Sequence, residues 1–296
     1  MSDEQTRLEP FDKGGRGLEG DTDPRRVITL LTDFGVSDHY VSVMKGVMLD
    51  INPNIQIIDI SHTIRPFEIQ EASVILAAAY HYFPKGTIHV GVVDPGVGSD
   101  RRGILTVTEN YYFVGPDNGI FSYALEDPAY LWTRELRTVD FFLDRVSSTF
   151  HGRDVFAPVA GYLSTEEAAE KFGPIVSDPI KLANVKAEMD SQGTIWGEVI
   201  YIDRFGNLIT NIETGVFWEG ELRVGEEENE CMPVIEIGDN IIKGMSEYYQ
   251  ETLEGQIGAH FNSWSRLEIF VPAGNAAQAI QVKKGAPVSV RFEVSA

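Results

Sequence analysis

Apolar runs and helical patterns alternate over the first half of the chain. Residues 27–32, 55–60 and 87–93 are short runs of mostly apolar positions, which is typical of strands buried on both faces. Between them, residues 40–50 and 68–82 repeat apolar positions at helical spacing. Strands that alternate with helices in this way predict βαβ units and a mainly parallel sheet. We therefore expect an N-terminal α/β domain.

The pattern changes after about residue 180. From residue 194 onward, short runs alternate between apolar and polar positions with period two, and turn residues separate them. This alternation predicts a smaller antiparallel, barrel-like β domain at the C-terminus. The expected divisions are a disordered tail at 1–26, the α/β domain at 27–180, a linker at 181–193 and the β domain at 194–296.

The composition narrows the classes of function. A net charge of −21 argues against binding a nucleic-acid backbone. The longest apolar runs are too short to span a bilayer, and no secretory signal precedes them. The single cysteine, Cys231, offers neither an internal disulfide nor a zinc cluster. We expect a cytoplasmic protein without a membrane or nucleic-acid partner.

Carboxylates follow the expected strands of the parallel sheet. Asp33 comes after the first strand, the Asp59–His62 corner after the second and Asp94 after the third. Ligands of such sheets bind outside the carboxyl ends of the strands. Asp94 also opens a turn with one Pro and two Gly, and Arg101 follows seven residues later. The turn is either a strand end with a surface ion pair or part of a functional site.

One histidine differs from the other five. His151 stands in Phe150-His151-Gly152-Arg153-Asp154, a constrained polar junction at the start of an expected helix. Its ordinary pKa near 6.5 suits the handling of a proton at neutral pH. The remaining histidines, His39, His62, His81, His89 and His260, are more typical of structural or exposed positions.

Several common enzyme motifs are absent from the sequence, which reduces the number of candidate functions. The chain has no phosphate loop, no dinucleotide-binding glycine motif and no nucleophile elbow. A mixed oxygen and nitrogen metal site remains possible at the strand ends, and it would suit a metal-dependent phosphoesterase. Its candidate ligands are Asp33, Asp38, His39, Asp59, His62 and Asp94.

The β domain carries small polar turns. In the hairpin turn from Tyr201 to Leu208, Asn207 can read the edge of a base and Phe205 can pack on a flat ring. Asn262-Ser263 and Gly274-Asn275-Ala276-Ala277 are two further turns of small residues, which allow a ligand to approach the backbone.

Six segments in order resemble the S-adenosyl-L-methionine (SAM) hydroxide adenosyltransferase family, whose relatives are the fluorinase and chlorinase enzymes. They are Thr32-Asp33-Phe34-Gly35, the Asp94–Arg101 turn, Gly115-Pro116-Asp117-Asn118-Gly119, Phe150-His151-Gly152-Arg153-Asp154, Asp203-Arg204-Phe205-Gly206-Asn207, and Asn262-Ser263 with Gly274-Asn275-Ala276-Ala277. The resemblance implies a homotrimer with active sites between the N-terminal domain of one subunit and the C-terminal domain of its neighbour.

The resemblance also implies a reaction. SAM would be the substrate, with no cofactor and no metal, and water would attack the ribose C5′ to give adenosine and L-methionine. The catalytic set would be Asp94, Arg101 and His151. Halogenases of this superfamily look different at the Asp and His positions, so their presence here favours water as the nucleophile. A chlorinase-like halogenase and a non-catalytic SAM or adenosine sensor are the alternatives.

The substrate-binding residues implied by the resemblance come from both domains. Asp33 would bind the ribose hydroxyls, Phe67 would cover the ribose, and Asp38 and Asp203 would accept the methionine ammonium. Phe205, Asn207, Ser263 and the backbone around Ala276 would form the adenine and methionine end. Trp264 stands where the fluorinase has an arginine for the methionine carboxylate, so Arg266 or backbone amides would replace that arginine.

Overall fold

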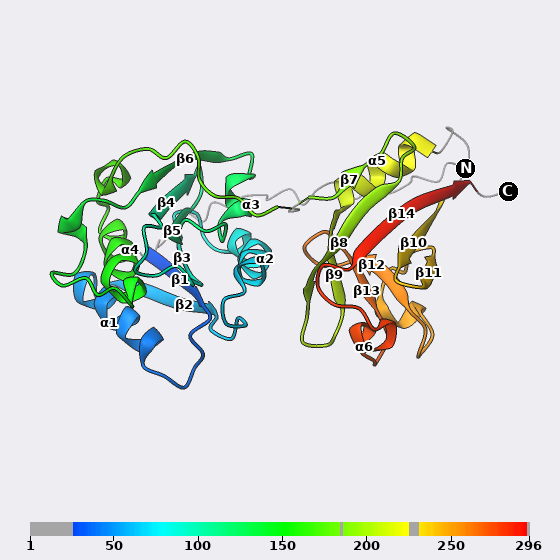
Figure 1. The fold of residues 1–296 in the computed structure, drawn as a ribbon, viewed down its shortest axis with the longest axis horizontal. Helices are drawn as coiled ribbons and strands as arrows, with labels where there is room; N and C mark the ends of the chain where they lie inside the picture. Colours follow the sequence, from blue (N-terminus) through cyan, green and yellow to red (C-terminus); the bar gives the residue numbers. More distant parts are fainter. Residues whose placement is uncertain (1–25, 184–185, 225–230, 295–296) are drawn as a thin grey trace, which may run out of the picture.

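The computed structural model describes residues 26–183, 186–224 and 231–294. Figure 1 shows two bodies that follow one another along the chain, one before and one after the segment near residue 185. The expected disordered tail at 1–26 lies outside the described residues, apart from Arg26, which begins the first strand.

The N-terminal body is built on one sheet of six strands in the order β2-β1-β3-β5-β4-β6. Strands β2, β1, β3 and β5 pair in parallel, and β4 pairs antiparallel with both β5 and β6. The mainly parallel sheet expected from the sequence is therefore confirmed. The strands are β1 Arg26–Thr32, β2 Ile55–Ser61, β3 Ile88–Val92, β4 Gly103–Thr108, β5 Tyr112–Pro116 and β6 Tyr130–Glu135.

Helices cover this sheet (Figure 1). Helices α1 and α4 pack in one hydrophobic cluster and α2 and α3 in another, which explains why the central strands are mostly apolar. The helices are α1 Tyr40–Ile51, α2 Ile69–Ala79, α3 Ser122–Leu125 and α4 Ala157–Ser164, with single turns at Tyr80–Tyr82, Val139–Phe141 and Gly152–Phe156. The pattern at 166–172 predicts a further helix, but only one 3₁₀ turn forms there, at Ala169–Phe172. Within the described residues, no helix combines the length and the apolarity needed to cross a membrane.

The C-terminal body is an antiparallel sheet that is nearly closed into a barrel, as expected. Its order is β11-β10-β14-β8-β9-β13-β12, with the short β7 paired to β8. The strands are β7 Glu188–Met189, β8 Ile195–Ile202, β9 Leu208–Glu213, β10 Cys231–Ile237, β11 Asn240–Lys243, β12 Gly258–Phe261, β13 Arg266–Phe270 and β14 Pro287–Val294. Helices α5 Thr214–Val224 and α6 Ala276–Ile280 and the turn Tyr249–Glu251 complete it.

The two bodies touch through α2 and the strands β8 and β9. Val74 of α2 is buried against Ile200 and Ile209. Glu68 and Lys284 form an ion pair across the same boundary. Leu182, in the expected linker, still donates its N–H to the Ser122 hydroxyl of the N-terminal body at 2.8 Å. The exact limits of the linker stay a prediction.

Candidate active site

Asp94 and Arg101 form a buried, two-pronged ion pair at the end of β3. Arg101 donates Nε–H to Asp94 Oδ1 at 2.9 Å, and its Nη2 lies 2.5 Å from Oδ2. The two side chains are only 5% and 12% exposed, respectively. The neighbouring Arg102 pairs instead with Asp117 and Asp178. The alternative of a surface ion pair, which the sequence left open, is therefore wrong, because both side chains are largely inaccessible to solvent.

The turn that carries the pair is docked on the segment before His151. Gly98 has a φ of +78°, and a Cβ placed on it would stand 2.1 Å from the carbonyl oxygen of Ser148. Only glycine allows both this conformation and this approach. The Asp94–Arg101 turn and the His151 segment are thus held against each other by their backbones.

His151 completes a group of three side chains. Its Nδ1 lies 2.9 Å from Arg101 Nη2. Because a guanidinium can only donate, Nδ1 is the acceptor, and the neutral imidazole carries its proton on Nε2. Burial and the positive charge of Arg101 both lower the pKa of His151, which favours the same neutral form. His151 therefore offers Nε2–H as a donor.

Two neighbours stabilise the His151 segment. Asp154 is fully buried and accepts the Ser147 N–H at 2.8 Å and the Arg153 Nε–H at 2.6 Å. Burial alone would raise the pKa of Asp154. The Arg153 guanidinium and the Ser147 N–H together lower this pKa by more than burial raises it, so the net shift is downward. The Arg101 guanidinium carbon lies over the Phe156 ring, 5.2 Å from its centre, which adds a cation–π contact.

Asp33 lies at the carboxyl end of β1 and reaches the loop before α2. Its Oδ2 accepts the N–H of Phe67 at 2.9 Å. Phe67 has a φ of +69°, and its side chain is 70% exposed. Asp38 is exposed in the loop before α1. Asp33, which the sequence places at the end of the first strand, thus contacts the backbone of Phe67, and the Phe67 side chain is exposed to solvent.

The six candidate metal ligands do not gather in one place. Asp59 accepts Lys45 Nζ–H at 2.6 Å and lies 3.0 Å from His62 Nε2, whereas Asp94 is held by Arg101. Across residues 26–183, 186–224 and 231–294, no three or more His, Cys, Asp or Glu side chains are placed to hold a metal ion. The six-residue site considered from the sequence is not formed.

In the C-terminal body, Asp203 organises its own turn. Oδ1 accepts the N–H groups of Phe205 at 2.8 Å and Asn207 at 2.9 Å, and Oδ2 lies 3.2 Å from Asn207 Nδ2. The Gly206 carbonyl accepts the N–H of Ala277 at 2.9 Å, which brings the turn to the start of α6 and hence to Ala276. Phe205 is 74% exposed. Four of the five expected C-terminal residues thus lie around one turn.

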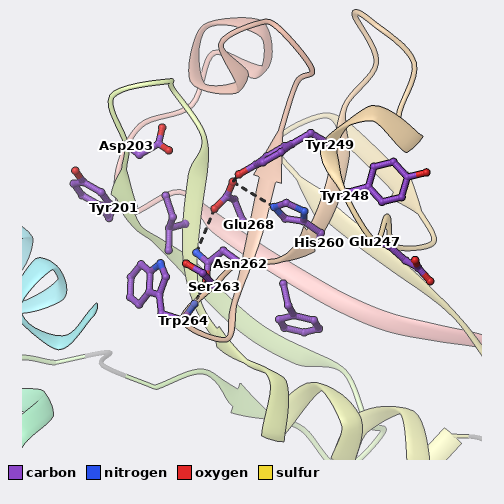
Figure 2. A pocket seen from close by; sticks show the side chains of 12 residues that line it. Tyr201, Asp203, Glu247, Tyr248, Tyr249, His260, Asn262, Ser263, Trp264 and Glu268 are labelled. Carbon is purple, nitrogen blue, oxygen red and sulfur yellow. Dashed lines mark hydrogen bonds and ion pairs between the residues drawn. The ribbon is translucent and has the colours of Figure 1, made fainter. Parts of the chain in front are cut away.

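A pocket of about 470 Å³ opens beside Asp203 (Figure 2). It contains Ser263, the fifth expected residue. Its walls are aromatic and acidic, and none of its described lining residues is Lys or Arg. The lining residues are Tyr201, Asp203, Ile209, Glu247, Tyr248, Tyr249, His260, Phe261, Asn262, Ser263, Trp264 and Glu268.

Sequence reasoning missed most of this pocket. It classed His260 as structural or exposed, and it overlooked Glu268, which is buried in the wall of the pocket. A usable signal was present, because Glu268 interrupts the apolar run Leu267-Glu268-Ile269-Phe270. A charged side chain inside an apolar strand needs partners when it is buried, and such partners often belong to a site.

Arg266 does not take the expected place of an arginine in this pocket. It is buried, donates Nη1–H to the Asn211 carbonyl at 3.0 Å and pairs through Nη2 with Glu213 at 2.8 Å. Its guanidinium carbon lies 5.3 Å from the centre of the Tyr123 ring. Arg266 is thus held by these partners and does not line the pocket, and its role toward the methionine carboxylate stays a prediction.

Comparison with known proteins places both bodies in one family. Sequence models of the SAM hydroxide adenosyltransferase N-terminal domain and C-terminal domain match residues 28–173 and 197–289. A protein of Thermus thermophilus named (R)-S-adenosyl-L-methionine hydrolase is 35% identical over 274 residues, covering 89% of this chain and 98% of the relative. One of Methanocaldococcus jannaschii with the same name is 42% identical over 192 residues, 63% of this chain and 67% of the relative.

A more distant relative and a solved structure support the same family assignment. A fluorinase of Actinoplanes is 24% identical over 67% of this chain and 77% of its own. The crystal structure of an uncharacterized conserved protein from Thermotoga maritima superposes with a TM-score of 0.80 at 35% identity, covering 89% of this chain and 99% of that one.

Proposed function

Because the chain belongs to the SAM hydroxide adenosyltransferase family, we propose that it hydrolyses SAM to adenosine and L-methionine. The observation that carries the proposal is the group formed by Asp94, Arg101 and His151, in which a buried guanidinium bridges a carboxylate and a neutral imidazole. This group serves as the water-activating part of the site.

The proposed step is a displacement at the ribose C5′. A water oxygen forms a bond to C5′ as the bond from C5′ to the sulfonium breaks, and the sulfur leaves with the electron pair as neutral methionine. Because this leaving group needs no proton, the protein has to orient the water and to favour its hydroxide character. Water is hardly ionised at neutral pH, and a positive charge beside it lowers its pKa and so favours hydroxide.

Arg101 supplies that charge, and Asp94 holds the plane of the guanidinium through two contacts. Because its Nδ1 is occupied by Arg101, His151 orients the water through Nε2–H as a donor. The proton that the water loses enters this group, in which the Asp94 carboxylate keeps lone pairs that can accept it, and it then passes to solvent. Positioning and electrostatics of this kind supply most of the rate enhancement in many enzymes.

We assign the ribose end of SAM to the N-terminal body. Asp33 would accept the ribose hydroxyls, and Phe67 would cover the sugar ring. The position of Asp33 at the carboxyl end of β1, with Asp94 at the end of the adjacent β3, supports this assignment. Asp38 would contribute to binding the methionine ammonium.

The C-terminal body would bind the two other parts of SAM. The Asp203 turn, with Phe205, Asn207 and the backbone at Ala276, suits adenine, a flat neutral ring with polar edges. The acidic pocket with Ser263 suits the methionine end, whose ammonium is positive, and Asp203 stands between the two.

We also propose that the protein is a cytoplasmic homotrimer in which two subunits share each site. The hydrogen bonds and ion pairs found for Asp33, Asp94, Arg101 and His151 in the described part of the chain stay within the N-terminal body. Phe67 and Phe205, one in each half-site, are largely exposed in the single chain. A neighbouring subunit that covers both rings would account for this exposure.

Product analysis tests the proposed reaction against halide transfer. The purified protein is incubated with each sulfonium epimer of SAM, with and without molar chloride, and the nucleosides are separated by chromatography. We expect adenosine in both conditions. Formation of 5′-chloro-5′-deoxyadenosine as the main product in chloride would make the protein a halogenase instead.

A further inference from the structure

Glu268 is a buried carboxylate in the wall of the C-terminal pocket (Figure 2). It is 4% exposed and accepts the Tyr249 hydroxyl at 2.8 Å and Asn262 Nδ2–H at 3.2 Å, while His260 Nε2 lies 3.4 Å away. No step of the proposed displacement uses this network. Its members lie on three separate segments, at the turn Tyr249–Glu251, on β12 with the turn after it, and on β13.

Asn262 connects Glu268 to the hairpin turn between β12 and β13. Its side-chain Oδ1 accepts the N–H of Trp264 at 3.2 Å and the N–H of Arg266 at 3.1 Å. Ser265 has a φ of +63°, a conformation that a serine adopts only under constraint. The turn is therefore closed around the Asn262 amide, and Ser263 lies at its tip in the pocket.

Glu268 orients the Asn262 amide together with the two N–H groups of the turn. Burial raises the pKa of Glu268, but the donors from His260, Tyr249 and Asn262 lower it more, so the carboxyl is ionised. An ionised carboxylate can only accept hydrogen bonds. Asn262 must therefore turn its NH₂ toward Glu268, and its oxygen is left facing the N–H groups of the turn.

We propose that Glu268 is a positioning residue that acts through Asn262 to fix the turn presenting Ser263 to the amino-acid end of SAM. The inference rests on the proposed function. The amino-acid end belongs in this pocket because Asp203, Glu247 and Glu268 make it negative, whereas Phe205, Asn207 and Ala276, which suit adenine, do not line it. With Arg266 committed elsewhere, the Ser263 turn is the polar backbone that meets this end of the substrate.

The variant Glu268→Gln tests the inference because it keeps the size of the side chain and removes the charge. A glutamine has no charge and can also donate, so it holds the Asn262 NH₂ less firmly than the carboxylate does, and only the N–H groups of Trp264 and Arg266 still orient the amide. Two substrates are compared: SAM, and 5′-deoxy-5′-dimethylsulfonioadenosine, which keeps adenosine and the sulfonium but lacks the amino-acid chain. We expect the KM for SAM to rise about tenfold and the KM for the truncated sulfonium to change less than about twofold, with kcat nearly unchanged for both.

Matched variants separate positioning from charge and from folding. Glu236→Gln removes a carboxylate from β10, where Glu236 pairs with Arg291 at 3.2 Å, and should leave both KM values unchanged. Asn262→Ala should raise the KM for SAM as Glu268→Gln does, and the double variant should be no worse than either single one, since the two act in one chain. Unchanged turnover of the truncated sulfonium shows that the variant is folded.

Equal changes in KM for the two substrates, or no change for SAM, would overturn the positioning role. Equilibrium binding of SAM and the truncated sulfonium to the wild type and to Glu268→Gln gives the same comparison without turnover. A wild type that binds SAM but releases no adenosine would therefore contradict the proposed function. In that case the change in Kd for SAM, compared with the change in Kd for the truncated sulfonium, still decides the role of Glu268.

Discussion

Gly98 lies against the carbonyl oxygen of Ser148, at a place where a Cβ on Gly98 would stand 2.1 Å from that oxygen. This contact joins the turn of Asp94 and Arg101 to the segment of His151, although about 50 residues separate them in the sequence. The relative position of the three side chains therefore depends on a glycine that carries no chemistry of its own.

Gly98→Ala should separate the two segments. The methyl group cannot be accommodated without moving the backbone, and a φ of +78° is itself unfavourable for alanine. We expect kcat to fall at least about tenfold and the free energy of unfolding to fall by about 2 kcal/mol. Gly35→Ala is the matched control: Gly35 has a φ of +72° but nothing within 4 Å of its Cβ position. Equal losses of kcat in the two variants would show that docking on Ser148 is unimportant.

The pH dependence of kcat should report the neutral form of His151. Because burial and Arg101 lower the pKa of this side chain, it stays neutral below the ordinary value near 6.5 and protonates only in more acidic solution. Activity should thus be retained at pH 6.5 and fall at lower pH, as protonation of Nδ1 expels the Arg101 contact. A rate that falls by half at or above pH 6.5 would contradict this assignment.

Arg101 should be irreplaceable by lysine. The guanidinium contacts both Asp94 oxygens and His151 Nδ1 at once, whereas a single ammonium cannot reproduce this planar arrangement. Arg101→Lys should lower kcat by about 100-fold with a smaller effect on KM.

Arg102→Lys is the adjacent control for that prediction. Arg102 pairs with Asp117 and Asp178, away from His151, so its replacement should leave kcat within about twofold of the wild type. Steady-state kinetics of the two variants decide between the neighbouring arginines. Comparable losses in both would mean that the positive charge of the region, and not the geometry at Asp94, governs the rate.

The positions of Asp33 and Asp94 in the N-terminal body follow from the strand pattern for a physical reason. The carboxyl ends of parallel strands share one edge of a sheet, so Asp33 and Asp94 could be brought together from the strand pattern alone. The set implied by the resemblance contains Arg101, and Arg101 is the arginine that pairs with Asp94, whereas Arg102 pairs with Asp117. What the pattern could not give is the Arg101 contact on Nδ1, which fixes the tautomer of His151.

The C-terminal half was less predictable because strand alternation breaks down there. Arg266 and Glu268 are two residues apart and would share a face of a regular strand. The pairing of β13 with β9 is irregular between them, and the two side chains have separate partners. Helix α5 was missed because period-two patterning was assumed for the whole domain, although Phe217 packs its ring on Phe261 and Phe292.

Arg266→Met should therefore affect stability more than substrate binding. The change leaves Glu213, about half exposed, without its partner and the Asn211 carbonyl without its donor. We expect the free energy of unfolding to fall by about 2 kcal/mol, measured by denaturant titration, and the KM for SAM to stay within about twofold. A large rise in KM at unchanged stability would return Arg266 to the substrate site.

The origin of the oxygen in adenosine tests the central claim most directly. The protein is incubated with SAM in ¹⁸O-labelled water, and both products are analysed by mass spectrometry. Attack of water at C5′ predicts that the label enters the 5′-hydroxyl of adenosine and that methionine stays unlabelled. Unlabelled adenosine, or no adenosine at all, would contradict the account.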